Sequence, residues 1–304
     1  EVQFVLSKLD AYMVHLCFVK GIYLVCVDAK DTVSVFSLYS KELLATFFAP
    51  NKITCVESDP TMDWLLIGLQ NGITMIYDID RDGVSPVEIQ NLQKEQFFSG
   101  HGISPVVSIQ WNPRNIGQIL ISYERVTLLY SFIEKSYKQH FVYELPIGAP
   151  GGDGKVTSTV RYPKVVQSLF HPNGLHILTV HEDNSLCFWD CNSGKLILAR
   201  SLYETGVNIP TGMTTPQPAN LSASIVSVHW ICAENPEYTQ LLIAGGDFGS
   251  NKPISLTLID LGGTPLYSVT SYEKMAKFYS IRSNQRIVPM PQHRSVAKVL
   301  PVPR

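Results

Sequence analysis

Three histidines at intervals of five residues raise the question of a metal site. They are His171, His176 and His181, and imidazole is a common metal ligand. Side chains alternate between the two faces of a β-strand, so His176 and His181, five positions apart, point in opposite directions within one strand. We therefore expect no metal here. Near turns between strands, such histidines are expected to join hydrogen-bond networks with Asp and Trp side chains.

Three carboxylates are candidates for acid–base chemistry, namely Asp78, Asp190 and Asp260. Each ends an apolar run at the same position of a different repeat, described below. Carboxylates that occur once per repeat cannot form one catalytic pair. We expect them to accept hydrogen bonds from the amides of nearby turns.

The segment Gly148–Lys155 reads GAPGGDGK and superficially resembles a phosphate-binding loop. The required first glycine falls on Ala149, and Val156 follows Lys155 where Ser or Thr is needed. No amphipathic helix follows to bind phosphate at its N-terminus, so we expect a flexible surface loop. The sequence also has no Gly-x-Ser-x-Gly or HExxH motif, and we expect neither an enzyme nor a cofactor.

Composition excludes several other classes of protein. The 304 residues have a formal net charge of −2 and are 45% hydrophobic and 16% charged, which indicates a globular chain without the basic surface of a nucleic-acid-binding protein. No run of 18 apolar residues is present, so no transmembrane segment is predicted. Four of the six cysteines lie in apolar runs and no CxxC pair exists, which favours a reducing, cytosolic location. The chain begins without Met or a signal peptide, and we interpret it as part of a longer protein.

A repeat with a constant interval organises the chain. Pro60, Pro113 and Pro172 each lie eighteen residues before the second residue of a pair. The first residue of each pair is aromatic and the second is Asp or Ser. These pairs are Tyr77-Asp78, Tyr130-Ser131 and Trp189-Asp190. Two short apolar runs joined by a polar turn lie between each proline and each pair. Self-similarity of this kind predicts a WD-type β-propeller blade, a four-stranded antiparallel sheet.

The fold class is therefore all-β, a WD-repeat β-propeller with about five blades. Near-continuous Val, Ile, Leu and aromatic runs suit strands buried on both faces. The blades are predicted at approximately 14–48, 53–90, 106–145, 165–203 and 226–270, with the last outer strand at 265–270. Residues 1–9 and 295–302 are expected to be stray strands of neighbouring blades. We interpret this as an incomplete part of a seven-bladed ring, because there are too few strands for seven degenerate blades.

Long insertions are predicted on one face of the blades. They span 91–105, 146–163, 204–224 and 271–294, and each joins an outer strand to the next inner strand. Insertions on one face of a repeat protein often form the binding face, although tolerated surface insertion is the alternative. The loop near 204–224 is rich in Pro, Thr and Asn and is expected to be mobile, and 271–294 is expected to contain a short helix. Aromatic and basic residues are favoured at interfaces, so the candidate interaction residues are Phe97, Phe98, Arg161, Tyr162, Lys274, Lys277, Phe278 and Tyr279.

Several runs resemble a known family. They include FVKGIYLVCVDAKDTVSVFSLYSKELLATFFAPNKITCVESDPTMDWLLIGLQNGITMIYDIDRD (18–82), YELPIGAPGGD (143–153) and PKVVQSLFHPNGLHILTVHEDNSLCFWDCNSGK (163–195). These runs are similar to the N-terminal propeller of the lethal giant larvae/tomosyn family, in particular its yeast branch in polarised exocytosis. That resemblance implies two fused seven-bladed propellers in the longer protein and no catalytic centre. It also implies a cytoplasmic protein that associates peripherally with the plasma membrane at sites of secretion.

The same resemblance implies partners. Members of the family bind Qbc- and Qa-type plasma-membrane SNAREs, and the yeast branch binds an exocytic Rab GTPase and exocyst subunits. Animal relatives also bind myosin II and act in cell polarity. The expected function is thus a non-enzymatic scaffold that controls vesicle docking and SNARE complex assembly. The alternative is a generic WD-repeat adaptor in a coat, ubiquitin-ligase or trafficking complex.

Overall fold

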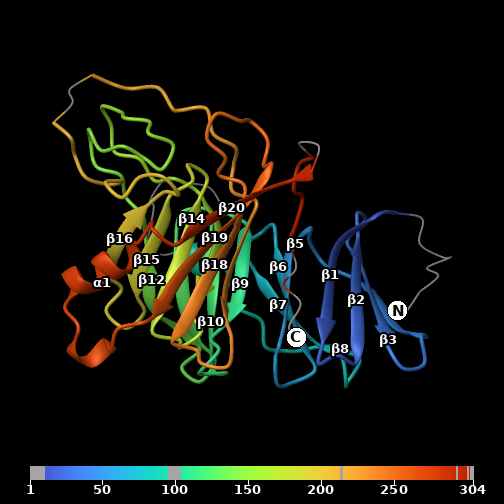
Figure 1. Cartoon of the computed structure of the whole chain (residues 1–304). Coiled ribbons are helices and arrows are strands. Elements are labelled where there is room, and N and C mark those ends of the chain that lie inside the picture. Colours follow the sequence, from blue (N-terminus) through green and yellow to red (C-terminus); the bar gives the residue numbers. More distant parts are fainter. Residues whose placement is uncertain (1–10, 95–103, 213–214, 292–293, 300, 302–304) are drawn as a thin grey trace. The chain divides into compact units, whose positions relative to one another are not determined.

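The structure is a computed structural model that describes residues 11–94, 104–212, 215–291, 294–299 and 301. It contains five four-stranded antiparallel sheets, and each sheet is built from strands that follow one another in the chain (Figure 1). The chain divides into two compact units, residues 1–111 and 112–304, which are described separately.

The described part of the first unit contains nine strands. They are β1 (Met13–Val19), β2 (Tyr23–Asp28), β3 (Thr32–Ser37), β4 (Leu43–Phe48), β5 (Ile53–Ser58), β6 (Trp64–Leu69), β7 (Thr74–Asp78), β8 (Gly83–Val84) and β9 (Val106–Trp111). The predicted outer strand at 86–90 is mostly absent. The outer strand is the two-residue β8, and Ile89 forms a single bridge with Thr74. A 3₁₀ turn follows at Leu92–Lys94.

The described part of the second unit contains eleven further strands and one α-helix. The strands are β10 (Gln118–Tyr123), β11 (Thr127–Ser131), β12 (Ser136–Phe141), β13 (Val165–Phe170), β14 (His176–His181), β15 (Leu186–Asp190), β16 (Leu196–Arg200), β17 (Ser227–Cys232), β18 (Tyr238–Ala244), β19 (Ser255–Gly263) and β20 (Gln285–Pro289). The helix is α1 (Tyr272–Tyr279). At eight residues, α1 is too short to cross a membrane, and the described part of the chain has no longer helix.

Each unit has an apolar core formed by the middle strands of its sheets. In the first unit, valines of β2 and β3 pack with Leu65 and Ile67 of β6, and all of these are fully buried. We number the sheets in chain order, so that the fourth sheet is β13–β16 and the fifth is β17–β20. In the second unit, Leu178 and Phe188 of the fourth sheet pack against Trp230 and Ile243 of the fifth. Strands buried on both faces explain the near-continuous apolar runs in the sequence.

The proline of each repeat lies at the start of the turn between the first and second strands. The residue before each proline accepts a hydrogen bond from a backbone N–H two residues on. Asp59 accepts from Thr61 at 2.7 Å, Asn112 from Arg114 at 2.9 Å, and His171 Nδ1 from Asn173 at 3.0 Å. A residue before proline favours extended backbone, so this motif ends the first strand and starts the turn.

Two of the three repeat aspartates have the predicted role. Asp78 and Asp190 each accept a backbone N–H of the following turn, from Arg81 and Asn192 respectively. Asp260 accepts the N–H of Gly262, but both residues lie within β19. In the repeat that lacks Asp, the Ser131 hydroxyl accepts from the Glu134 N–H of the following turn. Asp78 and Asp190 therefore stabilise turns, as predicted, whereas Asp260 does not bond to a turn amide.

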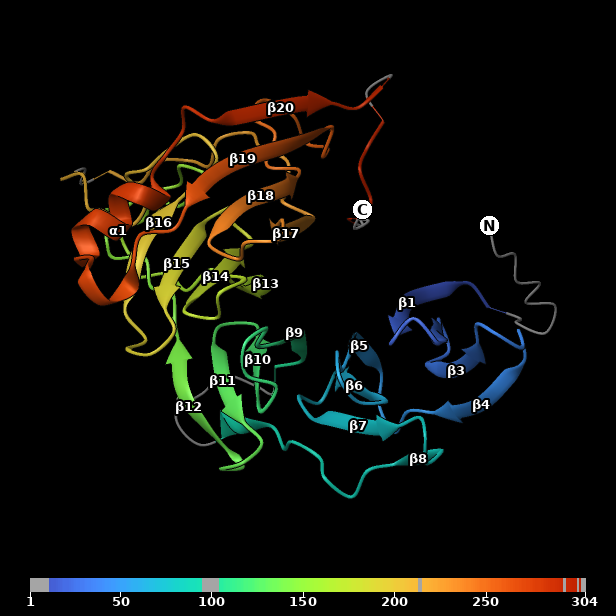
Figure 2. The same ribbon diagram turned by 60° about the horizontal axis from the view of Figure 1, so that its bottom comes forward.

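The fifth sheet differs from the prediction in its outer strand. Residues 265–270 contain a 3₁₀ turn at Tyr267–Val269, and the outer strand is β20, which follows α1 (Figure 2). Residues 295–299, predicted as part of a stray strand, have no strand structure. The prediction failed because Leu266 and Val269 look like strand residues although both are exposed, at 74% and 76%. The other predicted stray strand, within 1–9, lies outside the described residues.

Candidate interaction surface

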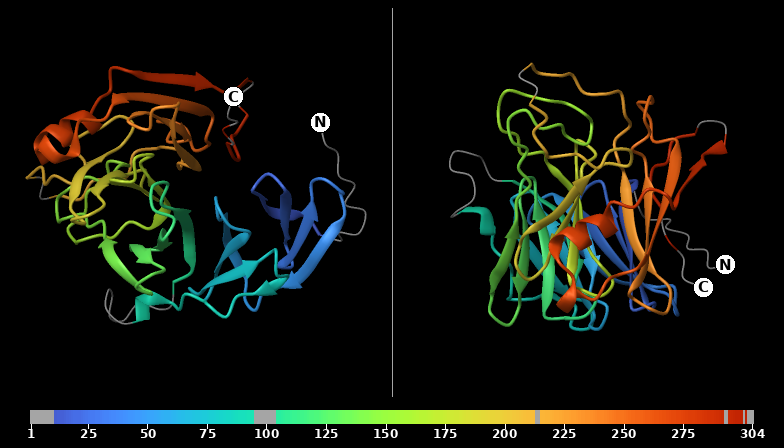
Figure 3. Two further views of the ribbon diagram at one scale, coloured as in Figure 1. Left: turned by 90° about the horizontal axis from the view of Figure 1, so that it is seen from below. Right: turned by 60° about the vertical axis from the view of Figure 1, so that its left-hand side comes forward.

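Two of the predicted insertions lie side by side in the second unit. Loops 146–163 and 204–224 rise together from one end of its strands (Figure 3). The backbone N–H groups of Asn208 and Asn220 donate to the carbonyls of Pro150 and Asp153, at 3.1 and 2.8 Å. Val156 and Gln217 form a two-way antiparallel bridge. The two loops therefore support each other.

The glycine-rich loop, Gly148–Lys155, is anchored on the turn between β14 and β15. The Gly152 N–H donates to the Asp183 carboxylate at 3.2 Å and to the Ser185 hydroxyl at 3.0 Å. A Cβ at Gly152 would lie 2.5 Å from the Ser185 nitrogen, and one at Gly151 would lie 2.5 Å from Asp183 Oδ2. Glycine is needed here for close packing, so the predicted flexible loop is wrong. Burial raises the Asp183 pKa, although bonds from Ser185 and Gly152 oppose the shift.

Loop 204–224 is anchored near its C-terminal end by Asn184, which lies in the same turn between β14 and β15. Its amide donates to the Ala223 carbonyl at 2.9 Å and accepts from the Ile225 N–H at 2.9 Å. Leu221 also accepts from the Gly249 N–H at 2.8 Å, within the turn that joins β18 to β19. The loop expected to be mobile is thus held at several positions along its length. We call the described residues of 146–163, 204–224 and 246–254 the loop platform.

The loop platform exposes large apolar side chains. Exposed fractions are 58% for Ile147, 60% for Ile209, 61% for Leu221 and 65% for Phe248, and Val160 is 41% exposed. Apolar side chains held in fixed positions by a hydrogen-bonded loop lose little entropy when another protein covers them. This arrangement is therefore suited to contact with protein. These residues carry no signal in the sequence, because isolated apolar residues in a Pro- and Thr-rich loop are common.

The segment after β19 is held to the fourth sheet at both ends. The Tyr267 and Tyr272 hydroxyls donate to Asp190 Oδ2 at 2.7 and 2.9 Å. At the other end, the buried Arg200 guanidinium donates to the carbonyls of Tyr279 and Ile281 at 3.0 and 2.8 Å. A cation at the C-terminus of α1 also complements the helix dipole. Burial lowers the Arg200 pKa to about 10.

The predicted residues of α1 divide into exposed and buried groups. Lys274 and Lys277 are exposed, and Phe278 is half-buried against the core. Tyr279 is fully buried, with its ring stacked 4.3 Å from Phe188 and its hydroxyl 2.9 Å from His176 Nδ1. The interpretation of Tyr279 as an exposed contact is therefore wrong. The helix needs this large side chain to attach to the sheet.

The other predicted interaction residues are only partly accessible or are not described. Arg161 and Tyr162 are half-buried. The Arg161 guanidinium donates to the Lys155 carbonyl at 2.6 Å, and the Tyr162 hydroxyl donates to Glu144 at 2.9 Å. Arg161 therefore helps to shape the glycine-rich loop. Phe97 and Phe98 lie outside the described residues.

The three histidines have separate hydrogen-bond partners. His181 contacts the Thr179 hydroxyl at 2.9 Å and the Pro163 carbonyl at 3.0 Å, and Trp189 donates to the same Thr179 at 2.8 Å. His171 contacts the Thr264 hydroxyl at 2.9 Å. Of the network predicted near the turns, the link to Trp is confirmed for His181, through Thr179 to Trp189. Across the described ranges, no group of three His, Cys, Asp or Glu side chains has the arrangement of a metal site.

Comparisons with known proteins agree with this fold. The family model described as "WD domain, G-beta repeat" matches residues 154–190. A β-propeller domain of Cps50 (Swd1) from Myceliophteria thermophila superposes with a TM-score of 0.56, at 14% identity, over 86% of this chain and 68% of that one. The predicted fold class, all-β with WD-repeat propeller blades, is confirmed.

Two curated relatives match nearly the whole chain. The Lethal(2) giant larvae protein homolog SRO77 of Saccharomyces cerevisiae is 51% identical over 292 residues, which is 95% of this chain. An uncharacterized protein of Schizosaccharomyces pombe is 28% identical over 321 aligned residues, which cover all of this chain. The chain spans 29% and 31% of the lengths of these two relatives.

Proposed function

Because the chain resembles the lethal giant larvae family of WD-repeat proteins along 95% of its length, we propose that it is part of a non-enzymatic scaffold for polarised exocytosis. In this proposal the scaffold binds Qbc- and Qa-type plasma-membrane SNAREs, an exocytic Rab GTPase and exocyst subunits. By these contacts it controls vesicle docking and SNARE complex assembly. It acts in the cytoplasm and associates peripherally with the plasma membrane. The 51% identity to the yeast homolog is the observation that carries the proposal.

The loop platform supports a role in protein binding and indicates where a partner would bind. Its hydrogen-bonded loops present Ile209, Leu221 and Phe248 to solvent at 60–65% exposure. Anchors of this kind, on a support that need not rearrange, contribute most of the affinity of many interfaces. We assign a SNARE or Rab contact to this platform.

The test measures binding of the 304-residue chain to purified partners by biolayer interferometry. The partners are a Qbc-SNARE, a Qa-SNARE and an exocytic Rab loaded with GTP analogue or GDP. At least one of them is expected to bind. Ile209→Asn with Phe248→Asn should weaken that binding by about tenfold or more. The matched control is Ile133→Asn, since Ile133 is 85% exposed in the turn between β11 and β12 of the same unit.

Failure of every partner to bind the folded chain would refute the assignment of these contacts to this part of the protein. If Ile133→Asn weakens binding as much as Ile209→Asn with Phe248→Asn does, the loop platform is not the contact surface.

The alternative is a generic WD-repeat adaptor, and the match to the WD repeat family at 154–190 favours it as much as the scaffold. Such an adaptor would use the same platform for a partner outside exocytosis. Affinity purification of the full-length protein, followed by identification of the captured proteins, distinguishes the two. SNAREs or exocyst subunits among them support the scaffold, and their absence beside a different stable complex supports the adaptor.

A further inference from the structure

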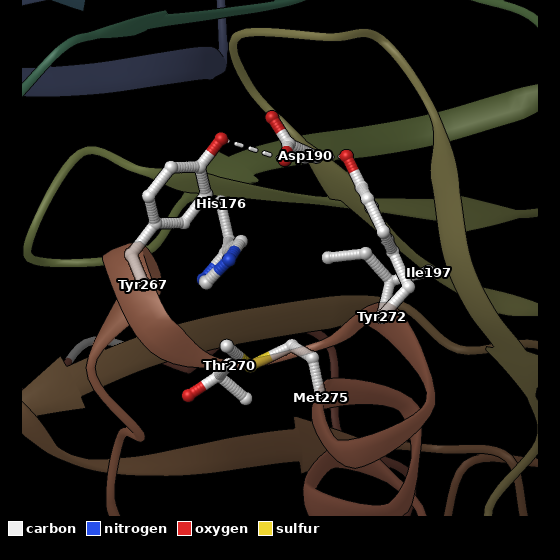
Figure 4. Close-up of a pocket in the computed structure, with 7 residues that line it drawn as sticks. All are labelled: His176, Asp190, Ile197, Tyr267, Thr270, Tyr272 and Met275. Atoms are coloured by element: carbon white, nitrogen blue, oxygen red, sulfur yellow. Dashed lines mark hydrogen bonds between the residues drawn. The ribbon is translucent and has the colours of Figure 1, made fainter.

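A cavity of about 170 Å³ lies between the fourth sheet and the segment that carries α1. Figure 4 shows Tyr267 and Tyr272 converging on Asp190 from opposite sides, with Met275 and Thr270 across the cavity. His176 and Ile197 complete the lining. The cavity thus combines two phenol rings, a thioether and a carboxylate.

The carboxylate at the end of this cavity is charged and has no cationic partner. Burial acts to raise the Asp190 pKa, but backbone and tyrosine hydrogen bonds outweigh it and hold the pKa below its usual value. None of the ion pairs among the described residues involves Asp190. Burial lowers the His176 pKa to about 4, so that ring is neutral at physiological pH. The Asp190 charge therefore attracts a cation.

All lone-pair positions of this carboxylate are already used. Oδ1 accepts the N–H groups of Asn192 and Ser193 at 2.8 and 2.9 Å. Oδ2 accepts the hydroxyls of Tyr267 and Tyr272 at 2.7 and 2.9 Å. A carboxylate offers about four such positions. A cation in the cavity would feel the charge but could donate no hydrogen bond to Asp190.

This restriction selects the chemical class of the cation. A primary ammonium has three N–H groups, and leaving them without acceptors in a cavity is costly. A methylated ammonium has few or no N–H groups to satisfy and is attracted to the faces of aromatic rings. The Tyr272 ring already accepts a cation of this protein, since the Lys195 ammonium lies 5.7 Å from its centroid.

We propose that this cavity binds the methylated side chain of a lysine on another protein. The four-carbon stem of that lysine is apolar and suits the Ile197 and Met275 side chains at the cavity wall. A choline headgroup has the same trimethylammonium, but its phosphate follows after two carbons. That phosphate would lie close to the Asp190 charge and would be repelled.

The test titrates the 304-residue chain with capped trimethyl-lysine, capped unmodified lysine and phosphocholine. The signal is the ¹³C-methyl resonance of Met275, assigned from the spectrum of Met275→Leu. Trimethyl-lysine is expected to shift this resonance and to bind about tenfold more tightly than unmodified lysine. An unmoved resonance, or equal affinity for both lysines, overturns the proposal. Tighter binding of phosphocholine than of trimethyl-lysine overturns the proposal that the bound cation is a methylated lysine.

Two variants test the reasoning about hydrogen bonds and rings. Tyr267→Phe keeps a ring but frees one position on Asp190 Oδ2, so unmodified lysine should gain affinity and the preference for trimethyl-lysine should fall about threefold or more. A purely structural role for this hydroxyl would not change that preference. Tyr272→Leu should reduce trimethyl-lysine binding about tenfold, whereas Tyr238→Leu, at an exposed tyrosine of β18 that does not line the cavity, should not.

A third variant covers the case in which Tyr272→Leu does not fold. Ile197→Phe fills the cavity from β16 and leaves every hydrogen bond of Asp190 in place. It should block trimethyl-lysine binding. Unchanged binding in Ile197→Phe overturns the proposed location.

Discussion

Acidification should destabilise the second unit, because three of its histidines are buried in neutral form. His171, His176 and His181 are at most 2% exposed. Burial lowers the pKa of His171 to about 3, with a contribution from neighbouring His176, and lowers the pKa of His176 and His181 to about 4. The perturbation is a change from pH 7.5 to pH 5.

The magnitude follows from proton linkage. The unfolded imidazole has a pKa of about 6.5, so between pH 6.5 and pH 4 the unfolded chain binds more protons than the folded one. Stability from these groups is complete above pH 6.5 and is lost as the pH falls toward the folded values. At pH 5 the loss is about 2 kcal/mol per histidine, or about 6 kcal/mol if the three add. That is a large part of the stability of a typical domain.

The assay is urea unfolding at several pH values, followed by hydrogen exchange of peptides from β13 to β16. The decisive variant is His181→Gln. It should lose about 1–2 kcal/mol at pH 7.5 because the contacts with Thr179 and Pro163 are weakened. Between pH 6 and 5, the variant's free energy of unfolding should also fall less steeply with acidification than that of the parent chain, by about 1 kcal/mol per pH unit. His140→Gln, at an exposed position of β12, is the matched control.

Equal pH dependence in His181→Gln and the parent chain would show that burial of neutral His181 does not cause the loss of stability. Direct titration of the His181 ring by NMR gives the same answer independently. A midpoint near pH 6.5 would mean that the ring is not held neutral by burial.

Two further predictions concern other parts of the chain. Gly152→Ala should destabilise the second unit by about 2–3 kcal/mol in urea unfolding, because the new Cβ meets the Ser185 backbone. Gly206→Ala, where nothing lies within 4 Å of the new Cβ, should be neutral, and equal effects of both would contradict the packing argument. Glu57→Gln should raise the stability of the first unit at pH 8.5, because burial raises the Glu57 pKa to about 8 and ionisation is then unfavourable in the fold. The gain is at most about 5 kcal/mol and should disappear near pH 4.5, and a gain that is constant with pH would show that Glu57 is not the cause.

The strands and their order could be predicted from the sequence because local signals were strong. Runs such as WLLIGL (64–69) and HILTVH (176–181) coincide with β6 and β14. Turns are stabilised by the residue before each repeat proline and by the aspartates that end β7 and β15. These side chains accept hydrogen bonds from backbone N–H groups two or three residues further along the chain. Short-range hydrogen bonds of this kind leave a spacing that can be read directly.

Outer strands and loops were predicted less well, because their structure depends on distant partners. Residues 265–270 have the composition of a strand, yet Tyr267 is held in a turn by Asp190, 77 positions away in the chain. Tyr279 looks like a surface aromatic until His176 and Phe188 surround it. No local pattern records such contacts.

The repeat, the sheet-forming runs, the turn chemistry and the resemblance to a family can all be read from the amino-acid order, because each depends on neighbours along the chain. The three-dimensional fold is needed to know which loops bond to one another, which aromatic side chains are exposed and which carboxylate accepts from two tyrosines. The physical reason is that exposure and charge compensation depend on what packs against a residue, and for the loops and α1 that partner lies tens of positions away.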